Sequence, residues 1–256
     1  MSRFIIGGNP FSGFSHQSIE KDLEMKRYFT TDRIKQTLKQ AEGLGITTHM
    51  SRTDHHILRV LMEYRDQGGK IQWFAQTCPE VGNHETCVSR AAEGGAKACH
   101  IHGGLMDFLF AQHKLDEIPP VVRMIKDRAM LAGIAAHNPE VIRWAEDNLD
   151  VDFYMCCYYN PASRDEQAAH VSGMEEWFRT EDRDAMVKLI KTLSKPAIHY
   201  KVLAAGRNDP EQAFAFVAKH LRPQDAVCVG VFPKDNPGML EQDLKLFETS
   251  LRKVSG

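Results

Sequence analysis

Short apolar segments alternate with longer amphipathic segments along almost the whole chain. The short segments are bounded by turn residues or run into glycine and proline, which is typical of buried strands. Strands are predicted at residues 3–8, 46–51, 70–77, 97–104, 129–138, 151–161, 196–206 and 225–233. The segments between them carry apolar residues at helical spacing, for example Ile34, Leu38 and Ala41 after a candidate N-cap at Thr31. The pattern therefore predicts eight strand–helix units.

The order and number of these units favour a (β/α)8 TIM barrel of the α/β class. Helices are expected at residues 30–45, 55–69, 84–95, 139–149, 180–194, 209–221 and 236–254, with a further helical region that ends near 128. Eight such units over this length match a single barrel domain, here residues 1–256. A doubly wound sheet is the alternative, but "FIIGGNPFSG" lacks the glycine spacing of its phosphate loop. Residues 160–180 are predicted to form a short lid or an inserted helix.

Composition narrows the classes of partner. The chain has 256 residues, is 43% hydrophobic, and has a net charge of -2 from 32 basic and 34 acidic residues. Because the two signs are well mixed, we expect neither a nucleic-acid partner nor a membrane surface. The first apolar run is too short for a signal peptide, and no run is long enough to cross a membrane. The six cysteines form no CxxC pair, so we predict reduced thiols in a cytoplasmic protein.

The fourth predicted strand ends in "CHIHGG", residues 99–104. Alternate strand side chains share a face, so His100 and His102 look the same way. Barrel chemistry lies where strands end. We therefore expect His102 at the mouth, as a proton donor or substrate hydrogen-bonder. His100 is expected one layer deeper, as a buried and hydrogen-bonded core residue.

The remaining strand ends are rich in imidazoles and cations but poor in carboxylates, of which Asp54 and Asp235 stand out. A bound metal needs three or four ligands that converge on one point. His49 is predicted to face the surrounding helices, which leaves His137 and His16 as further candidates. Because carboxylate partners are scarce, no catalytic metal is expected.

Four places in the sequence resemble the aldo-keto reductase superfamily over roughly residues 1–250. They are "GITTHMSRTDHH", "HIHGG", "GIAAHNPEVI" with "DFYMCCYYNP", and "IHYKVLAAG" with "VFPKDNPGMLEQDL". The resemblance implies an aldo-keto-reductase-like barrel. It also implies a catalytic site that in this family combines Asp, Tyr, Lys and His, with tyrosine as the acid during hydride transfer.

Three of these four positions differ in this chain. The family histidine corresponds to His102, but the aspartate position holds Met50 and the tyrosine position holds His55. The lysine position holds Thr77 or Gln76. The resemblance therefore implies a divergent member in which His102 and His55 are left to move protons, and we expect no ordinary aldehyde reductase activity.

The same resemblance bears on a cofactor. Tyr200 corresponds to the residue that stacks on the nicotinamide, Lys201 lies at the turn around the pyrophosphate, and Lys234 matches a lysine that meets an adenosine phosphate. With Arg207 these residues form a candidate binding group for NADP or for an anionic or phosphorylated small molecule. The sequence leaves open which of these ligands is used.

Three functions remain open at this point. The first is a barrel enzyme, of lyase or isomerase type, that performs acid/base chemistry on a small polar carbonyl or sugar-like substrate. The second is a divergent NADP-dependent oxidoreductase, and the third is a barrel that binds a ligand without catalysis. His102, His55 and Asp54 are the candidate catalytic residues. Asp54 would orient His55 or, with Thr53 as the other candidate, would cap the helix that begins beside it.

Overall fold

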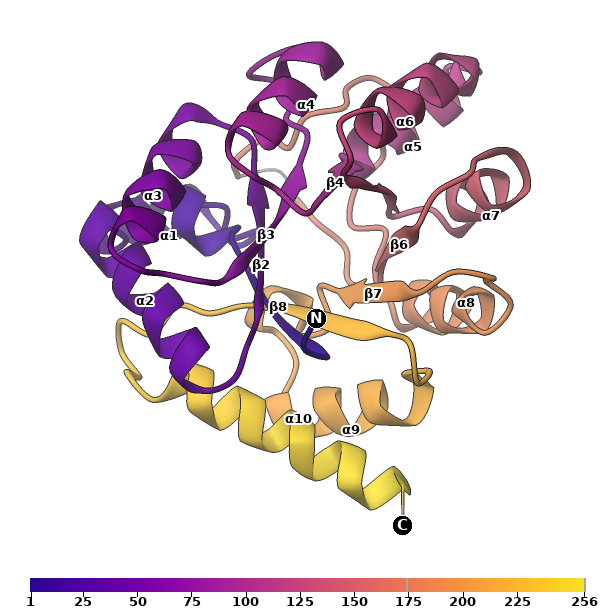
Figure 1. Ribbon diagram of the computed structural model, residues 1–256. Coiled ribbons are helices and arrows are strands. Elements are labelled where there is room, and N and C mark those ends of the chain that lie inside the picture. The colour runs from indigo at the N-terminus through magenta and orange to yellow at the C-terminus, as the bar shows by residue number, and fades with distance from the viewer. Residues whose placement is uncertain (174, 256) are drawn as a thin grey trace.

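Eight strands close into a parallel barrel in chain order, with β1 beside β8, in a computed structural model that describes residues 1–173 and 175–255 (Figure 1). The predicted TIM barrel is therefore confirmed. Residues 174 and 256 of the predicted domain lie outside the described residues. The strands are β1 Phe4–Gly7, β2 Thr48–Arg52, β3 Gln72–Gln76, β4 Ala98–Ile101, β5 Leu131–Ala136, β6 Phe153–Cys157, β7 Ala197–Tyr200 and β8 Ala226–Gly230.

Helices surround the barrel on its outside (Figure 1). They are α1 Ile19–Tyr28, α2 Thr31–Gly43, α3 His55–Asp66, α4 His84–Glu93, α5 Gly103–Ala111, α6 Ile118–Lys126, α7 Pro139–Asn148, α8 Thr180–Ile190, α9 Pro210–His220 and α10 Met239–Ser255. Short 3-10 turns lie at Pro10–Ser12, Leu115–Glu117 and Ala204–Gly206. The sequence pattern missed α1, and the described part of 160–179 contains neither a helix nor a strand. The cap of α2 is Thr30 rather than Thr31, because Thr30 Oγ1 accepts the Arg33 N–H.

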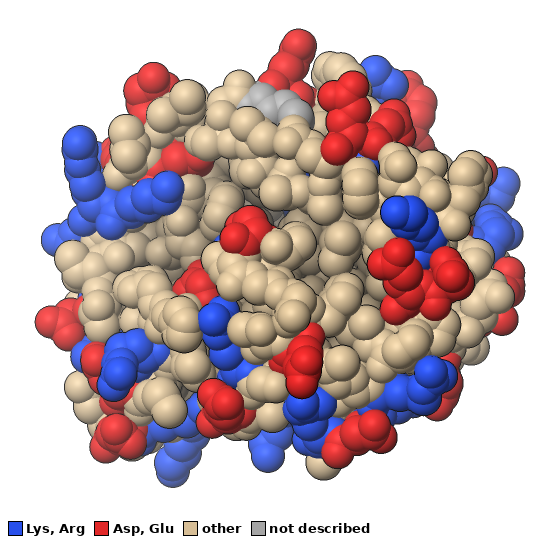
Figure 2. All heavy atoms as spheres, turned by 90° about the horizontal axis from the view of Figure 1, so that it is seen from above, with Lys and Arg blue, Asp and Glu red and all other residues tan. Residues whose placement is uncertain are grey.

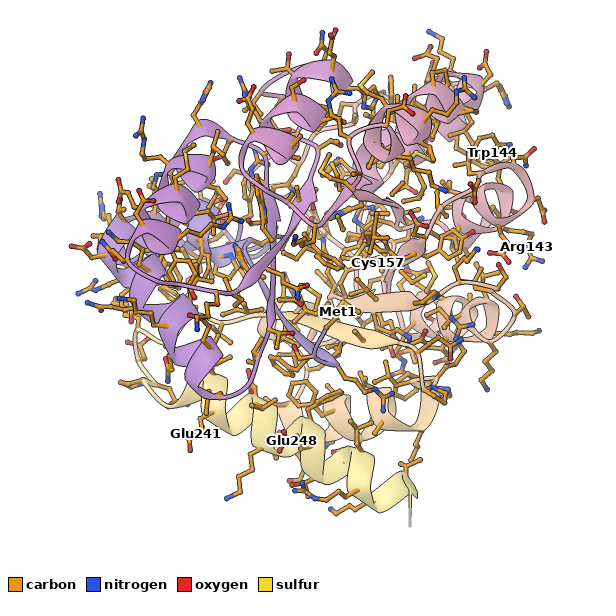
Figure 3. The ribbon with its side chains drawn as sticks, viewed as in Figure 1. Met1, Arg143, Trp144, Cys157, Glu241 and Glu248 are labelled. Atoms are coloured by element: carbon orange, nitrogen blue, oxygen red, sulfur yellow. The ribbon has the colours of Figure 1, made fainter. Side chains whose placement is uncertain are left out.

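Strand side chains alternate between the barrel interior and the helical layer. The interior cluster contains Ile5, Met50, Phe74, Ala98, Ala135, Phe153, Met155, Ile198 and Ala226. His49 faces outward as predicted, with its ring 5.4 Å from the Phe11 ring and its Nδ1 3.1 Å from the Ile6 carbonyl oxygen. Figure 3 shows Cys157 in the middle of the barrel, whereas Trp144 lies out on α7. This alternation decides which strand-end side chains can reach the mouth.

The fourth strand is shorter than predicted because "CHIHGG" is both a strand end and a helix start. Strand β4 stops at Ile101, and His102 is the N-cap residue of α5. A Cβ added to Gly104 would lie 2.4 Å from the Ala168 carbonyl oxygen. The glycine therefore lets the connection after β6 pass close over the first turn of α5.

The distribution of charged residues on the surface agrees with the mixed charge of the sequence. Figure 2 shows Lys and Arg interspersed with Asp and Glu on the face in view. No described helix has the length and apolarity that a membrane crossing needs. All six cysteines are free, and five of them are buried.

His100 is buried as predicted, and the hydrogen bond expected of it is reduced to a weak one with the backbone at Ala75. Its ring lies edge-on to Phe153, 6.3 Å between centroids, and neither ring nitrogen meets a partner with hydrogen-bond geometry among the described residues. Burial lowers the pKa of His100 to about 3, opposed only by the backbone at Ala75. The ring is therefore a neutral polar group at the base of the strand-end cavity that keeps little of the hydrogen bonding it had in water.

Replacing His100 by a residue of similar bulk should be tolerated. We expect His100→Leu to change the free energy of unfolding at pH 7 by less than about 1 kcal/mol, because only a weak hydrogen bond is lost. In the unfolded chain His100 is protonated below pH ~6.5, whereas in the folded protein its pKa is about 3. The free energy of unfolding therefore decreases as the pH falls below ~6.5. His100→Leu should therefore lose stability less steeply between pH about 7 and about 5 than the parent.

Urea unfolding at pH 7 and pH 5 measures the free energy of unfolding of each variant. The control is the exposed His56→Gln variant, whose stability should change with pH as that of the parent does. A loss of about 2 kcal/mol or more at pH 7, with the parent slope retained, would show that His100 has an essential hydrogen bond.

Candidate functional site

A cavity of about 620 Å³ opens at the C-terminal ends of the strands, where barrel active sites lie. This volume suits a small molecule. Side chains from the strand ends and the following loops line it. Those that carry chemistry are His16, Arg52, Glu80, His100, His102, His137, Arg164, His170, Tyr200, Lys201, Asp235 and Asp243.

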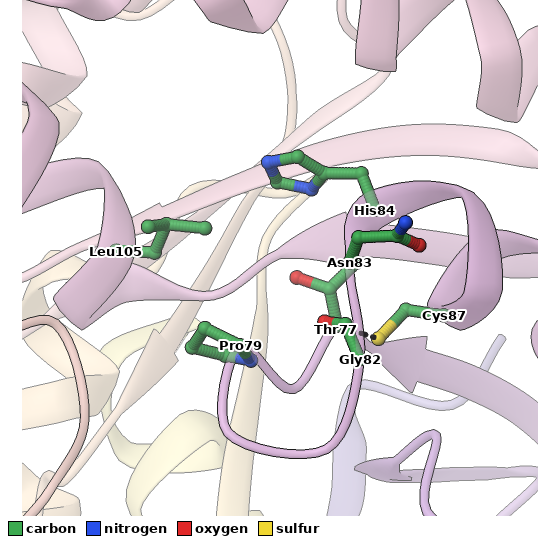
Figure 4. Close-up of a pocket in the computed structure, with 7 residues that line it drawn as sticks. All are labelled: Thr77, Pro79, Gly82, Asn83, His84, Cys87 and Leu105. Carbon is green, nitrogen blue, oxygen red and sulfur yellow. Dashed lines mark hydrogen bonds between the residues drawn. The ribbon is translucent and has the colours of Figure 1, made fainter.

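A second pocket lies away from these groups, between the β3–α4 loop and the start of α5 (Figure 4). It measures about 150 Å³ and is lined by Thr77, Pro79, Gly82, Asn83, His84, Cys87 and Leu105. Its walls are mostly apolar, and burial lowers the pKa of His84. The pocket offers packing space rather than a convergent set of reactive groups.

His102 lines the cavity with a fixed tautomer. Its Nδ1 accepts the Leu105 N–H at 3.3 Å, as the side-chain cap of α5. Its own backbone N–H donates to Thr77 Oγ1 at 3.0 Å. Burial, reinforced by His137 and Arg164, lowers the pKa of His102 well below its ordinary value. The ring is neutral at pH 7, so its proton sits on Nε2 and can be donated.

His137 lines the same cavity with the opposite arrangement. Its Nδ1 lies 2.7 Å from Asp107 Oδ2, and Asp107 also accepts the backbone N–H groups of His137 and Asn138. Because the Asp107 carboxylate accepts these bonds, the Nδ1–H of His137 is the donor, and Nε2 is left as a base. Burial lowers the pKa of His137 and outweighs the opposing effect of Asp107.

The start of α5 brings these groups together. A Cβ added to Gly103 would lie 3.1 Å from the Tyr200 hydroxyl and 3.3 Å from His137 Cε1. The His137 and Tyr200 rings are 6.0 Å apart and edge to face. Burial raises the pKa of Tyr200 well above its ordinary value, so this hydroxyl stays protonated. Gly103, the residue after His102, therefore lies against both His137 and Tyr200, and a larger residue there would meet their side chains.

Two cations face the cavity without a carboxylate partner. Within the described part of the chain, no carboxylate oxygen lies within 4.0 Å of Lys201 or Arg164. Arg164 donates from one terminal nitrogen to the Ala169 carbonyl oxygen at 2.9 Å. Burial lowers the pKa of Lys201. The positive potential of this pair is available to an anionic ligand.

A third group forms where the β1–α1 loop meets the connection after β6. His16 Nδ1 is 2.8 Å and His170 Nδ1 is 3.4 Å from Glu176 Oε1. The two imidazole rings are 4.4 Å apart, and the Glu176 side chain is 2% exposed. Lys201 Nζ lies 3.4 Å from His16 Nδ1. The donor atoms of the three side chains lie within 4.8 Å of one another, close enough to share a metal ion.

The structure does not bring His55 and Asp54 to the cavity. His55 is exposed at the start of α3, with Nε2 2.9 Å from Arg90. Asp54 is the N-cap of α3, since its Oδ1 accepts the Ile57 N–H at 2.9 Å, and its Oδ2 pairs with Arg52. The capping interpretation of Asp54 is therefore confirmed, and the pair takes no part in the chemistry inferred below.

The cations expected to hold NADP are not arranged around one phosphate. Lys234 is exposed and paired with Glu24. Arg207 donates to the carbonyl oxygens of Ala204 and His16, and stacks on the Phe178 ring at 4.3 Å.

The cavity lining near β8 is acidic instead, with Asp235 and Asp243, and burial raises the pKa of Asp243 to about 6. Tyr200 and Lys201 do line the cavity. Arg207 and Lys234 do not line it, so the structure does not assemble the four residues predicted to hold NADP into one group.

The strand-end reading missed Asp107, Arg164, His170 and Glu176. Asp107 sits in α5, whose sequence "GGLMDFLFA" is otherwise apolar, and a single carboxylate in such a helix was a usable signal. The other three come from the irregular connection after β6. No sequence periodicity could assign their directions.

Comparisons with known proteins support the fold. No protein-family model matches the chain, and no curated protein matches it significantly. Among solved structures, an aldo-keto reductase from Pseudomonas aeruginosa superposes with a TM-score of 0.66 and 15% identity, over 98% of this chain and 91% of that one. The holo form of an aldo-keto reductase from Bacillus halodurans gives 0.58 and 9%, over 99% and 92%.

A truncated 3-deoxy-D-arabino-heptulosonate 7-phosphate synthase from Thermotoga maritima gives a TM-score of 0.53 and 14% identity, over 98% of this chain and 84% of that one. At these identities the likeness concerns the fold. The expected resemblance is confirmed at that level, because the chain has the barrel fold of the aldo-keto reductases.

The two roles of His102 can be separated by substitution. His102→Ala should lower the free energy of unfolding by about 1 kcal/mol, because it removes the side-chain cap of α5. His102→Asn should restore most of that loss, because asparagine is a good N-cap residue, yet it supplies no imidazole to the cavity. Chemical denaturation of both variants measures the difference. Equal stability of parent and alanine variant would mean that the cap contributes nothing.

Proposed function

We propose that this barrel is an enzyme that performs acid/base chemistry on a small polar carbonyl or sugar-like compound, without hydride transfer. One observation carries the proposal: two histidines line the same cavity, and their hydrogen-bond partners favour opposite tautomers. His137 presents a basic Nε2 because its Nδ1–H donates to Asp107, and His102 presents an Nε2–H because its Nδ1 accepts the Leu105 N–H. A base and an acid that need no further activation are thus supplied together.

The reaction class that uses this pair is proton transfer next to a carbonyl. His137 Nε2 removes a proton from the carbon beside the carbonyl, and the C–H electron pair forms the double bond of an enol, or of an enediol where that carbon carries a hydroxyl. His102 Nε2–H donates its proton to the carbonyl oxygen as negative charge develops there. In the enediol, His102 takes a proton back from the second hydroxyl while His137 returns its proton to the former carbonyl carbon, which completes an isomerisation. Return of a proton to the carbon that lost it gives exchange with solvent, so atoms and charges balance without a redox cofactor.

The lining supports an anionic substrate. Lys201 and Arg164 face the cavity beside this histidine pair and lack carboxylate partners within the described residues. A carboxylate or phosphate of the substrate would be held by these two cations rather than by Arg207 and Lys234. We further propose a reducing, cytoplasmic location, which suits the six free cysteines.

The NADP-dependent alternative has less support. Met50 and Gln76 line the cavity where the resemblance implies the aspartate and lysine that activate the tyrosine, and Thr77 holds the backbone of His102. His55, at the tyrosine position, lies outside the lining. A unit of cooperating catalytic residues fails when several members are lost.

Solvent exchange tests the reaction class directly. The protein in deuterium oxide, with pyruvate, dihydroxyacetone phosphate, xylulose and fructose as probes, should catalyse deuterium incorporation beside the carbonyl of at least one. Proton NMR measures it, with no NADPH added. Asp107→Asn and His137→Gln should each slow exchange by about 100-fold or more, because the base is lost or its tautomer is no longer fixed. The rate should hold at pH ~6.5 and fall only at lower pH, because burial lowers the pKa of His137 below its ordinary value and keeps the ring unprotonated there.

The exposed His56→Gln and Asp116→Asn variants serve as matched controls and should keep the parent rate. NADPH oxidation at ordinary reductase rates, with no exchange in its absence, would contradict the proposal and favour the divergent oxidoreductase.

Anion binding can be tested without turnover. Inorganic phosphate and pyruvate should raise the melting temperature of the parent, because a ligand that binds only the folded state stabilises it. Lys201→Met and Arg164→Met should each abolish most of that shift, whereas Lys188→Met, an exposed lysine on α8, should retain it. Retention of the full shift in both cavity variants would place the anion elsewhere.

A further inference from the structure

We propose that His16, His170 and Glu176 bind a divalent first-row transition metal ion, with zinc expected first, at the rim of the cavity. The three side chains come from two segments far apart in the chain, the β1–α1 loop and the connection after β6. Their donor atoms lie within 4.8 Å of one another. This goes beyond the proposed acid/base function, and metal binding itself does not depend on that function.

The first argument is the unpaired polar atoms. Glu176 Oε2 and His170 Nδ1 are both buried, and neither has a hydrogen-bond partner among the described residues. His170 Nδ1 lies only 3.4 Å from Glu176 Oε1, but the two atoms do not meet the geometry of an N–H···O hydrogen bond. Leaving such groups unsatisfied costs free energy. A cation held by the Glu176 carboxylate and the His170 ring would give both side chains a partner.

The second argument is the ligand chemistry. Two imidazoles and one carboxylate, with a position left open, form a common donor set for catalytic zinc, and for iron in some enzymes. Around a tetrahedral zinc ion the donor atoms stand roughly 3–3.5 Å apart. Here Glu176 Oε1 stands 2.8 Å and 3.4 Å from the Nδ1 atoms of His16 and His170. These two separations therefore lie close to that spacing, and all three donor atoms lie within 4.8 Å of one another.

Ligation through Nδ1 of His16 requires an acceptor for the proton on Nε2. This Nε2 lies 3.4 Å from Asn9 Nδ2, so turning the Asn9 amide over would supply the acceptor. With Nδ1 on the metal, Nε2 carries the proton, and a flipped Asn9 amide presents its oxygen to accept it. Such an outer hydrogen bond fixes the tautomer and orientation of a ligating histidine.

The alternative is a hydrogen-bonded cluster stabilised by the neighbouring Lys201 ammonium, 3.4 Å from His16 Nδ1. That arrangement accounts for the His16–Glu176 bond. It leaves Glu176 Oε2 and His170 Nδ1 without partners, and within the described chain Lys201 makes no ion pair with Glu176. The metal accounts for all of these atoms.

His16 and His170 line the cavity that also contains His102 and His137. An open coordination position would therefore face the bound substrate. If the proposed acid/base function holds, the metal would polarise the carbonyl oxygen whose neighbouring proton His137 removes. The sequence analysis did not identify Glu176 as a metal ligand, because this residue lies in the connection after β6, where no periodic pattern predicts the direction of a side chain.

The full chain, freed of metal by dialysis against a chelator, can be titrated with cobalt and then with zinc. We expect one ion per chain and a visible cobalt spectrum typical of nitrogen and oxygen ligands, without the near-ultraviolet charge-transfer band of thiolate. Glu176→Gln and His170→Gln should weaken zinc binding by at least about 100-fold, since loss of an outer partner alone costs about 10–100-fold. Their matched controls, exposed Glu175→Gln and His56→Gln, should bind as the parent does.

Three outcomes would overturn the site: no binding by the parent, unchanged affinity in both ligand variants, or a thiolate band that places the metal on cysteine. If the ligand variants fail to fold, proton NMR of the cobalt-loaded parent decides. Two strongly shifted, exchangeable imidazole N–H signals are expected, and their absence contradicts the proposal. Because no substrate is present, failure here is distinct from failure of the exchange assay.

Discussion

Closure of eight parallel strands into one barrel is the constraint on which the rest of the structure depends. It fixes the inward face of every strand, and it gathers all the C-terminal strand ends at one mouth. The apolar interior below is sealed by residues such as Phe74 and Phe153. Polar groups that the closed interior cannot accommodate therefore accumulate at that mouth, where His102, His137 and Lys201 lie together.

Burial at the mouth then determines the chemistry. Desolvation lowers the pKa of both His102 and His137, so two imidazoles that would titrate near neutrality in water remain uncharged. Their hydrogen-bond partners then determine which ring nitrogen carries the proton. His102 Nδ1 accepts the Leu105 N–H at the N-terminus of α5, and His137 Nδ1–H donates to Asp107. One helix therefore sets both tautomers, since Leu105 and Asp107 both belong to α5.

The barrel could be predicted from the sequence because hydrophobic periodicity and barrel size are repeated eight times. Strand parity was enough to place His49 outside and His102 at the mouth. Strand parity could not show which side chains of the connection after β6 line the cavity. Arg164, His170 and Glu176 lie in a connection without periodicity, and contacts over long sequence separations fix their directions.

The predictions for His55 and His100 differed from the structure for physical reasons. Position after a strand suggested that His55 faces the mouth, but Asp54 caps α3 and turns that residue outward to Arg90. His100 was expected to be satisfied because most buried polar groups are, and its ring instead meets Phe153.

The central claim is that His137 and His102 are neutral in opposite tautomers. Long-range nitrogen–proton correlation NMR on protein labelled at histidine measures this directly near pH 7, with His102→Asn and His137→Gln used to assign the signals. The account predicts a proton on Nδ1 of His137 and on Nε2 of His102. The same tautomer in both rings, or a protonated imidazolium in either, would contradict it.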